Sequence, residues 1–337
     1  MERERIRASF KILTGYVFLF LAIAAGLRKG NDPDYANYKE IYEGAVSSVV
    51  VDVEPAYQKL NFFFDAVGFG FEGLILAIAL ASVMMKCIAI IKYSEYFFLS
   101  LLIYISTIYL LFDVVAIRQG FAIAIIMLSL ALWENDKKKA LLLYVFAPLI
   151  HIASLVFLPV LLLCNRNYGR KTLLVSIAAI TVIVTLSQVF SIIDVMENIP
   201  FIPDFLLIKL KTYSSYNKEA VFSFKQVIVS IFAYLVYTKV SCSRYVKLCC
   251  VVYIFGCLIS SLFSSVGDIA FRIKWFFSWT EIIFLPYLIG YSYRYFRDNE
   301  MRLISRFLFF TLIFSMYFIP AYNFIESIHE RGFSLIL

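Results

Sequence analysis

The chain has 337 residues, of which 62% are hydrophobic and only 16% are charged, and its mean hydropathy is +0.82. Soluble domains carry about a quarter charged residues, so the composition excludes that class and indicates an integral membrane protein. The formal net charge is +7, but the basic residues recur in short clusters between apolar runs instead of forming one patch for nucleic acid.

The apolar runs, taken in chain order, predict an all-α, polytopic membrane protein. About ten runs are long and apolar enough for spanning helices, each of which needs about 20 residues. We expect residues 1–337 to form a single transmembrane domain. The runs are 10–27, 71–91, 96–112, 114–132, 140–163, 171–193, 223–240, 248–266, 275–292 and 303–320.

The basic clusters predict how the chain crosses the membrane. Four Lys and Arg residues within the first eleven positions place the N-terminus in the cytoplasm, and the first run is expected to remain as a signal-anchor. Lys86 with Lys92 and the later clusters are then expected on the cytoplasmic side. The acidic loops, approximately 28–70 and 194–222, are expected outside.

The run 140–163 departs from this simple pattern, because basic clusters flank both of its ends. Its centre contains Pro148, His151 and Pro159, which are unusual in a plain spanning helix. A broken or re-entrant hairpin, with its tip toward the outside, accounts for both the charges and the prolines. The alternative is one proline-kinked helix, about 36 Å long.

Arg118 is the first residue that suggests chemistry. It opens the apolar run that continues to Trp133 and follows Asp113 by five residues. An arginine at the centre of a bilayer costs about 2.5–3.5 kcal/mol, so it needs an interface, a partner or a polar cavity. Arg118 is therefore an interface anchor, a partner of Asp113, or a fixed cation for a phosphate group.

His151 lies in the same segment as the predicted break, with Ser154 three residues later. A histidine in an apolar run is commonly a packing residue. Next to a polar cavity, a neutral imidazole instead serves as a general base or orients a hydroxyl.

A second group of charges lies near residue 272. Arg272 and Lys274 precede two tryptophans, Asp268 has helical spacing to Arg272, and Glu281 is a charge inside an apolar run. These residues form either a second cationic site or internal ion pairs that stabilise the helix bundle.

Motifs of soluble enzymes are missing from the sequence. It has no nucleotide-binding glycine loop, no HExxH, no GxSxG and no CxxC. Only two histidines are present, which argues against a zinc site. The six cysteines lie in apolar runs or beside basic loops, so they indicate no disulfide framework.

Four short elements in order suggest a family. They are DYANYKEIY from Asp34, EPAY from Glu54, RQGFA from Arg118, and HIAS from His151. Together, from about residue 10 to 320, they resemble the EpsG family, within the Wzy-type polymerases of O-antigen, capsule and exopolysaccharide. Ala56 stands where the family usually has glycine.

The resemblance implies a multi-pass enzyme of the bacterial inner membrane with its active site on the extracytoplasmic face. Its substrates would be oligosaccharide repeat units on undecaprenyl diphosphate. A growing glycan would pass from its lipid diphosphate to a hydroxyl of the next unit. The lipid bilayer, a flippase and chain-length regulator proteins are the implied partners. No metal, cofactor or nucleic acid is implied.

The chemistry of this transfer suggests roles for the candidate residues. Arg118 and Arg272 would stabilise the leaving diphosphate, and His151 would be the base or orienting group. Tyrosine rings of the outer loop would lie along one side of a short interfacial helix and face sugar rings, with Asp34 at its start. The substrate-binding candidates are Asp34, Tyr35, Tyr38, Tyr42, Glu54, Tyr57, Gln119 and Lys274, and Asp34 and Glu54 are further candidates for the base.

Rival functions remain open from the sequence alone. A flippase or other transporter would use a charged path through the bilayer, and it often has internal repeats, which are not visible here. A ligase would use the same donor with a different acceptor. A membrane acyltransferase or a structural partner of the assembly machinery is a more distant alternative.

Overall fold

The computed structural model describes residues 2–28, 30, 32–47, 53–163, 167–187, 196–198, 208, 211, 224–295 and 302–333. All of its regular elements in this part of the chain are helices, as the hydropathy pattern predicts. Most of the outer loop predicted at 194–222 lies outside the described residues.

The chain divides into two compact units. The first consists of Met1–Leu155 with Ser292–Leu337, and the second of Val156–Tyr291.

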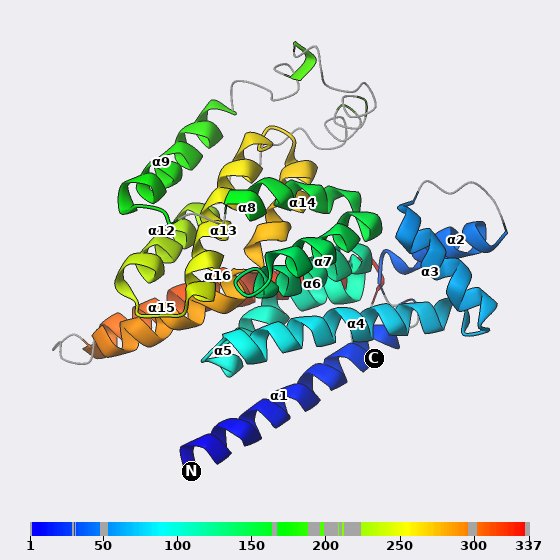
Figure 1. The fold of residues 1–337 in the computed structure, drawn as a ribbon, viewed down its shortest axis with the longest axis horizontal. Coiled ribbons are helices and arrows are strands. Elements are labelled where there is room, and N and C mark those ends of the chain that lie inside the picture. Colours follow the sequence, from blue (N-terminus) through cyan, green and yellow to red (C-terminus); the bar gives the residue numbers. More distant parts are fainter. Residues whose placement is uncertain are drawn as a thin grey trace. The chain divides into compact units, whose positions relative to one another are not determined.

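The first unit is built around α4, which contacts α1, α3, α6 and the π-helix η1 (Figure 1). Side chains of α4 that face these neighbours, such as Leu74 and Val83, are fully buried. Besides two short helices, the unit contains α1 (Glu2–Gly26), α4 (Gly70–Tyr93), α5 (Phe97–Tyr104), η1 (Ile105–Val115), α6 (Ile117–Leu132), α7 (Lys137–Ile150) and α16 (Arg302–Glu330).

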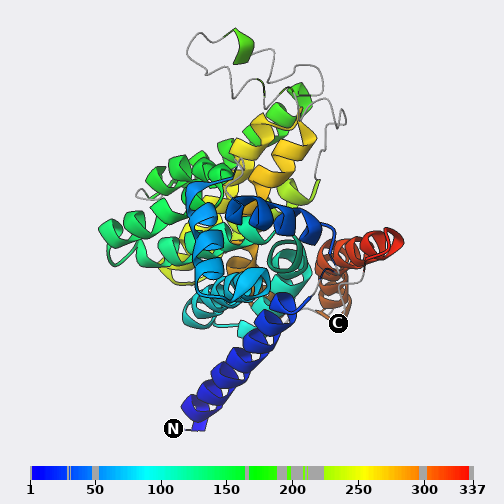
Figure 2. The same cartoon turned by 90° about the vertical axis from the view of Figure 1, so that its right-hand side faces the viewer.

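Two short helices, α2 (Tyr35–Val46) and α3 (Pro55–Ala66), precede the amino end of α4. They pack on one another and, through α3, on α4; the view in Figure 2 shows them crossing. The predicted short helix at the start of the outer loop is therefore confirmed. Its tyrosines pack this helix onto the rest of the unit, because Tyr38 and Tyr42 belong to a buried cluster that includes Tyr57, Phe71 and Ile117.

The second unit contains six helices in its described part, and α13 lies at its centre with contacts to α8, α9, α12 and α14. Tyr253 and Cys257 on α13 are almost fully buried. The helices are α8 (Leu158–Leu163), α9 (Arg170–Leu186), α12 (Phe224–Lys239), α13 (Arg244–Leu262), α14 (Gly267–Ser278) and α15 (Glu281–Tyr295).

Four helical segments of the described chain are long and apolar enough to cross a membrane: Gly70–Tyr93, Phe97–Val115, Arg244–Leu262 and Arg306–Glu330. Several shorter apolar helices accompany them. This pattern indicates a multi-pass membrane protein. Helix α14 was not predicted as an element, because its sequence mixes charged and aromatic residues.

The segment 140–163 is broken, as the broken-hairpin interpretation predicts. Helix α7 ends at Ile150, His151 is extended (φ −151°, ψ 106°), and a 3-10 helix, η2, covers Ile152–Phe157 before α8 begins. Pro148 lies within α7, so the break follows this proline by three residues. Pro159 is tolerated because it lies in the first turn of α8.

Gly120 offers a direct test of helix packing in the first unit. A Cβ atom at this position would overlap the carbonyl oxygen of Phe112, whereas a Cβ at Gly15 of α1 would meet nothing within 4 Å. Gly120→Ala should therefore lower the free energy of unfolding by about 1–3 kcal/mol. Thermal unfolding in detergent measures this change. Gly15→Ala is the control, and equal stability of the two variants would contradict the close approach.

Candidate functional site

Three helix ends of the first unit meet at the carboxylate of Glu54. Glu54 is the residue before α3, and its extended conformation (φ −62°, ψ 142°) is the one that a following proline favours. Pro55 at the first helical position has a fixed φ suited to the start of a helix. A carboxylate at this end of α3 is also favoured by the helix dipole.

Each oxygen of Glu54 is held by a different element. Oε2 accepts a hydrogen bond from Arg118 Nη1 at 2.7 Å, and Oε1 accepts one from the Ile152 backbone N–H at 3.0 Å. Oε1 also lies 3.3 Å from His151 Nδ1. Glu54 therefore joins the start of α3 to the start of α6 and to the residues after α7.

The break at His151 makes this arrangement possible. Because α7 ends at Ile150, the N–H of Ile152 is directed to Glu54 instead of to a carbonyl one turn earlier. Sequence reasoning identified Glu54 and His151 separately but missed this backbone donor, since no side chain marks it.

The three side chains are partly shielded from solvent, with 13% of Glu54, 13% of His151 and 20% of Arg118 exposed. Burial alone would raise the pKa of the Glu54 carboxyl. Hydrogen bonds from His151 and the Ile152 N–H, together with the charge of Arg118, outweigh burial and lower that pKa to about 2. Glu54 is therefore a fixed anion at neutral pH, which makes it a poor general base.

Arg118 lies against aromatic rings from α2 and α3. Its guanidinium carbon is 5.7 Å from the ring centroid of Tyr38 and 5.3 Å from that of Tyr57, distances at which a cation is attracted to a ring. Burial raises the pKa of Tyr38 to about 12, with Asp34 adding to the rise and Arg118 opposing it. Arg118 is thus held by Glu54 on one side and by two rings on another.

The tyrosine prediction needs correction on this point. Tyr38, Tyr42 and Tyr57 are 4%, 7% and 0% exposed, so their rings form core contacts and do not present open faces to sugars. Tyr42 donates a hydrogen bond to Asp65 at 3.0 Å, and the partly exposed Tyr35 donates one to Glu72 at 2.9 Å. Apolar packing of α2 on α3 and α4 explains the burial.

Two other predicted binding residues lie near these elements. Asp34 is the residue before α2, as predicted, but its side chain makes no capping hydrogen bond, and the Asp34 N–H itself donates to Asp32 Oδ1. Gln119 follows Arg118 on α6 and is 6% exposed.

The remaining predicted cations belong to the second unit. Arg272 is exposed, and the side chain of its predicted partner Asp268 lies outside the described residues. Lys274 Nζ is 5.3 Å from the ring centroid of Trp275. Glu281, only 2% exposed, pairs with Lys225 at 3.5 Å, which supports the internal ion pair considered for it.

Comparison with protein families matches this chain to the EpsG family over residues 11–331. The chain belongs to the EpsG family. Comparisons with curated proteins and with solved structures find no significant match. Membership in the EpsG family links the chain to exopolysaccharide biosynthesis.

The EpsG-family chain also contains a charged pair that sequence reasoning missed. Asp113 does not pair with Arg118; it accepts a hydrogen bond from Lys86, which is fully buried in α4. Lys86 was expected in a cytoplasmic basic cluster with Lys92, but its side chain is fully buried and pairs with Asp113. Two opposite charges inside neighbouring apolar runs were the available signal.

The lowered pKa of Glu54 predicts how stability depends on pH. Its ionised form contributes stability that is fully present above the ordinary carboxyl pKa of 4.5 and is lost as the pH falls toward about 2. Glu54→Gln should lower the free energy of unfolding by about 2 kcal/mol at pH 7. It should also remove the part of the acid sensitivity of stability that comes from Glu54. Thermal unfolding in detergent from pH 7 to pH 3 tests both effects.

A matched control is Glu43→Gln, because Glu43 is 65% exposed and lies 3.8 Å from Lys39. It should leave the pH profile unchanged. If Glu54→Gln and wild type lose stability in parallel as the pH falls, the bonds assigned to Glu54 are wrong.

Proposed function

We propose that this chain polymerises undecaprenyl-diphosphate-linked oligosaccharide repeat units into a surface polysaccharide, on the extracytoplasmic face of the bacterial inner membrane. The observation that carries the proposal is the junction at Glu54, where one carboxylate holds an arginine and a histidine together. Glycan transfer from a lipid diphosphate needs a cation for the leaving group and an acceptor for a proton.

Arg118 is suited to the diphosphate. A guanidinium has five N–H donors, and Glu54 accepts from only one of its nitrogens at 2.7 Å. Arg118 Nε and the Tyr57 hydroxyl are buried, and neither has a hydrogen-bond partner among the described residues. A phosphate oxygen would supply the acceptor that both donors lack, and arginine binds phosphate in a charge-assisted, bidentate manner.

His151 is suited to the acceptor hydroxyl. With Nδ1 directed at Glu54, the proton on that nitrogen is stabilised and Nε2 is left as the basic atom. In the proposed step, the sugar hydroxyl oxygen bonds to the anomeric carbon of the donor glycan while the bond from that carbon to the diphosphate oxygen breaks. The hydroxyl proton passes to His151 Nε2, and the bonding electrons leave on the diphosphate.

Glu54 holds both groups and does not take the proton itself. Its low pKa keeps it ionised, so it stabilises a positive charge on His151 and orients Arg118. In this mechanism the base is therefore His151, and Glu54 is no longer a candidate for that role. Arg272 and Lys274 of the second unit stay predictions for further phosphate contacts.

Arg118→Ala should abolish long-chain glycan while the protein still inserts into the membrane. The test is the glycan gel profile of a deletion strain that carries the variant, with its amount measured in the membrane fraction. The matched control is Arg170→Ala, because Arg170 is an exposed arginine in the first turn of α9. Only single-unit glycan is expected for Arg118→Ala, and wild-type chain length for the control.

The same gel separates the rival functions. Unattached polymer would indicate a ligase, and repeat units retained inside the cell would indicate a flippase. Wild-type chain length with Arg118→Ala would show that the phosphate role of Arg118 is wrong.

His151→Gln should lower the polymerisation rate by at least about 100-fold, because general base catalysis contributes about 10²–10⁴-fold. The rate is measured as polymer formed over time in membranes that contain equal amounts of protein. His329→Gln is the matched control, since His329 is the other histidine and is exposed on α16. Equal rates for the two variants would exclude His151 as the base.

A further inference from the structure

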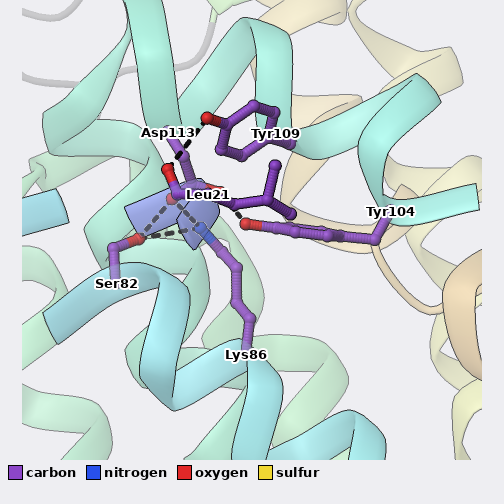
Figure 3. Close-up of polar contacts among 6 residues, drawn as sticks. All are labelled: Leu21, Ser82, Lys86, Tyr104, Tyr109 and Asp113. Atoms are coloured by element: carbon purple, nitrogen blue, oxygen red, sulfur yellow. Dashed lines mark hydrogen bonds and ion pairs between the residues drawn. The ribbon is translucent and has the colours of Figure 1, made fainter. Parts of the chain in front are cut away.

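A buried ion pair joins α4 to η1 inside the first unit (Figure 3). Lys86 of α4 has no exposed side-chain surface, and neither has Asp113 of η1. Neither charge takes part in the junction at Glu54. A charged pair in this setting is costly to bury, so its retention calls for a specific reason.

The carboxylate of Asp113 is satisfied by three side chains. Oδ1 accepts from Lys86 Nζ and, at 2.6 Å, from Ser82 Oγ, while Oδ2 accepts from the Tyr104 hydroxyl at 2.7 Å. Lys86 Nζ also donates to Ser82 Oγ at 2.8 Å. Figure 3 shows these groups converging on Asp113 from separate parts of the ribbon. The network therefore fixes both the rotation of η1 and its position along α4.

Asp113 lies in an unusual helix. Residues Ile105–Val115 form a π-helix, a conformation that is rare and frequently marks functional sites. Ala116 N–H donates to the Leu111 carbonyl at 2.8 Å, and Ala116 then leaves helical geometry (φ −86°, ψ 63°). Helix α6 begins immediately afterwards, at Ile117.

The end of η1 is packed closely against the first turn of α6. Gly120 approaches the carbonyl of Phe112 so closely that no Cβ fits between them. Arg118 lies in this same turn of α6, two residues after Ala116. A movement of η1 along α4 would therefore move the backbone that carries Arg118.

We propose that Lys86 and Asp113 are a positioning pair for Arg118: by locking η1 on α4, they hold the start of α6 where Arg118 reaches Glu54. Apolar contacts between η1 and α4 have no preferred direction and leave η1 free to shift along α4. The Tyr109 hydroxyl of η1 donates to the Leu21 carbonyl of α1, so that bond does not set the position of η1 on α4. The hydrogen bonds to Asp113 are directional and remove that freedom. This inference rests on the proposed function for its catalytic consequence, but its geometric part does not.

The test uses the full-length protein with the double substitution Lys86→Met and Asp113→Leu. Replacing both charges avoids a lone buried charge, so the protein should still fold. The single variant Lys86→Arg keeps a cation and its N–H donors opposite Asp113, so it should retain wild-type function. Lys92→Met removes an exposed lysine from the same helix and is the matched control.

Two measurements are made on each variant. Hydrogen–deuterium exchange of the backbone amides at 116–121 reports the start of α6 and requires no substrate. Polymer formation in a deletion strain reports activity at equal protein amounts. For the double variant, we expect at least about 10-fold faster exchange confined to 116–121 and about a 100-fold loss of polymer, since a misplacement of about 1 Å costs this much in rate.

The outcomes separate the inference from the proposed function. Local exchange that rises in the double variant and returns in Lys86→Arg supports the positioning pair, even if the wild-type protein proves not to be a polymerase. Wild-type exchange at 116–121 overturns the inference. Exchange that rises throughout α4 and α6, with activity lost in proportion to unfolding, also overturns it, because the pair would then be only a stabilising contact.

Discussion

The carboxylate of Glu54 is the interaction on which the candidate site depends. It accepts hydrogen bonds from Arg118 at the start of α6 and from Ile152 after the end of α7, while itself preceding α3. Helix ends leave backbone groups unsatisfied and concentrate partial charge. A single anion at their meeting point satisfies a donor from the break and balances a cation at a helix start, where a positive charge is otherwise unfavourable.

This junction is supported by two kinds of packing. On one side, Tyr38 and Tyr57 form part of an apolar cluster that fixes α2 and α3 against α4 and places rings beside Arg118. On the other side, the Lys86–Asp113 pair fixes η1 against α4. The apolar cluster has no preferred direction and tolerates small shifts, whereas the hydrogen bonds of the Lys86–Asp113 pair are directional. Both interactions position helix α6, because α6 follows η1 in the chain and contributes Ile117 to the apolar cluster.

The apolar surroundings also explain why the charges inside the helix bundle occur in pairs. A charge inside a poorly hydrated bundle interacts strongly with its neighbours and is retained only when it is paired. In the first unit, Lys86 pairs with Asp113, Arg28 with Asp32 and Arg118 with Glu54; in the second, Lys225 pairs with Glu281. The pair at Glu54 differs from these because its acid also faces a histidine. A cation and a histidine held by one carboxylate is the combination on which the proposed glycan transfer rests.

The sequence by itself determined most of the helices, the break in 140–163 and the candidates Arg118 and His151, because hydropathy, proline and charge act locally; the family motif added Glu54. Only the tertiary structure decided the partners. Arg118 pairs with Glu54, 64 residues away, instead of with nearby Asp113, and Glu54 reaches the Ile152 N–H across 98 residues. The tyrosine spacing of α2 predicts that the rings share one face of the helix. That face could equally well bind sugars or pack into a core. Which of these forms depends on the helix that covers that face, and only the folded chain brings α3 and α4 against it.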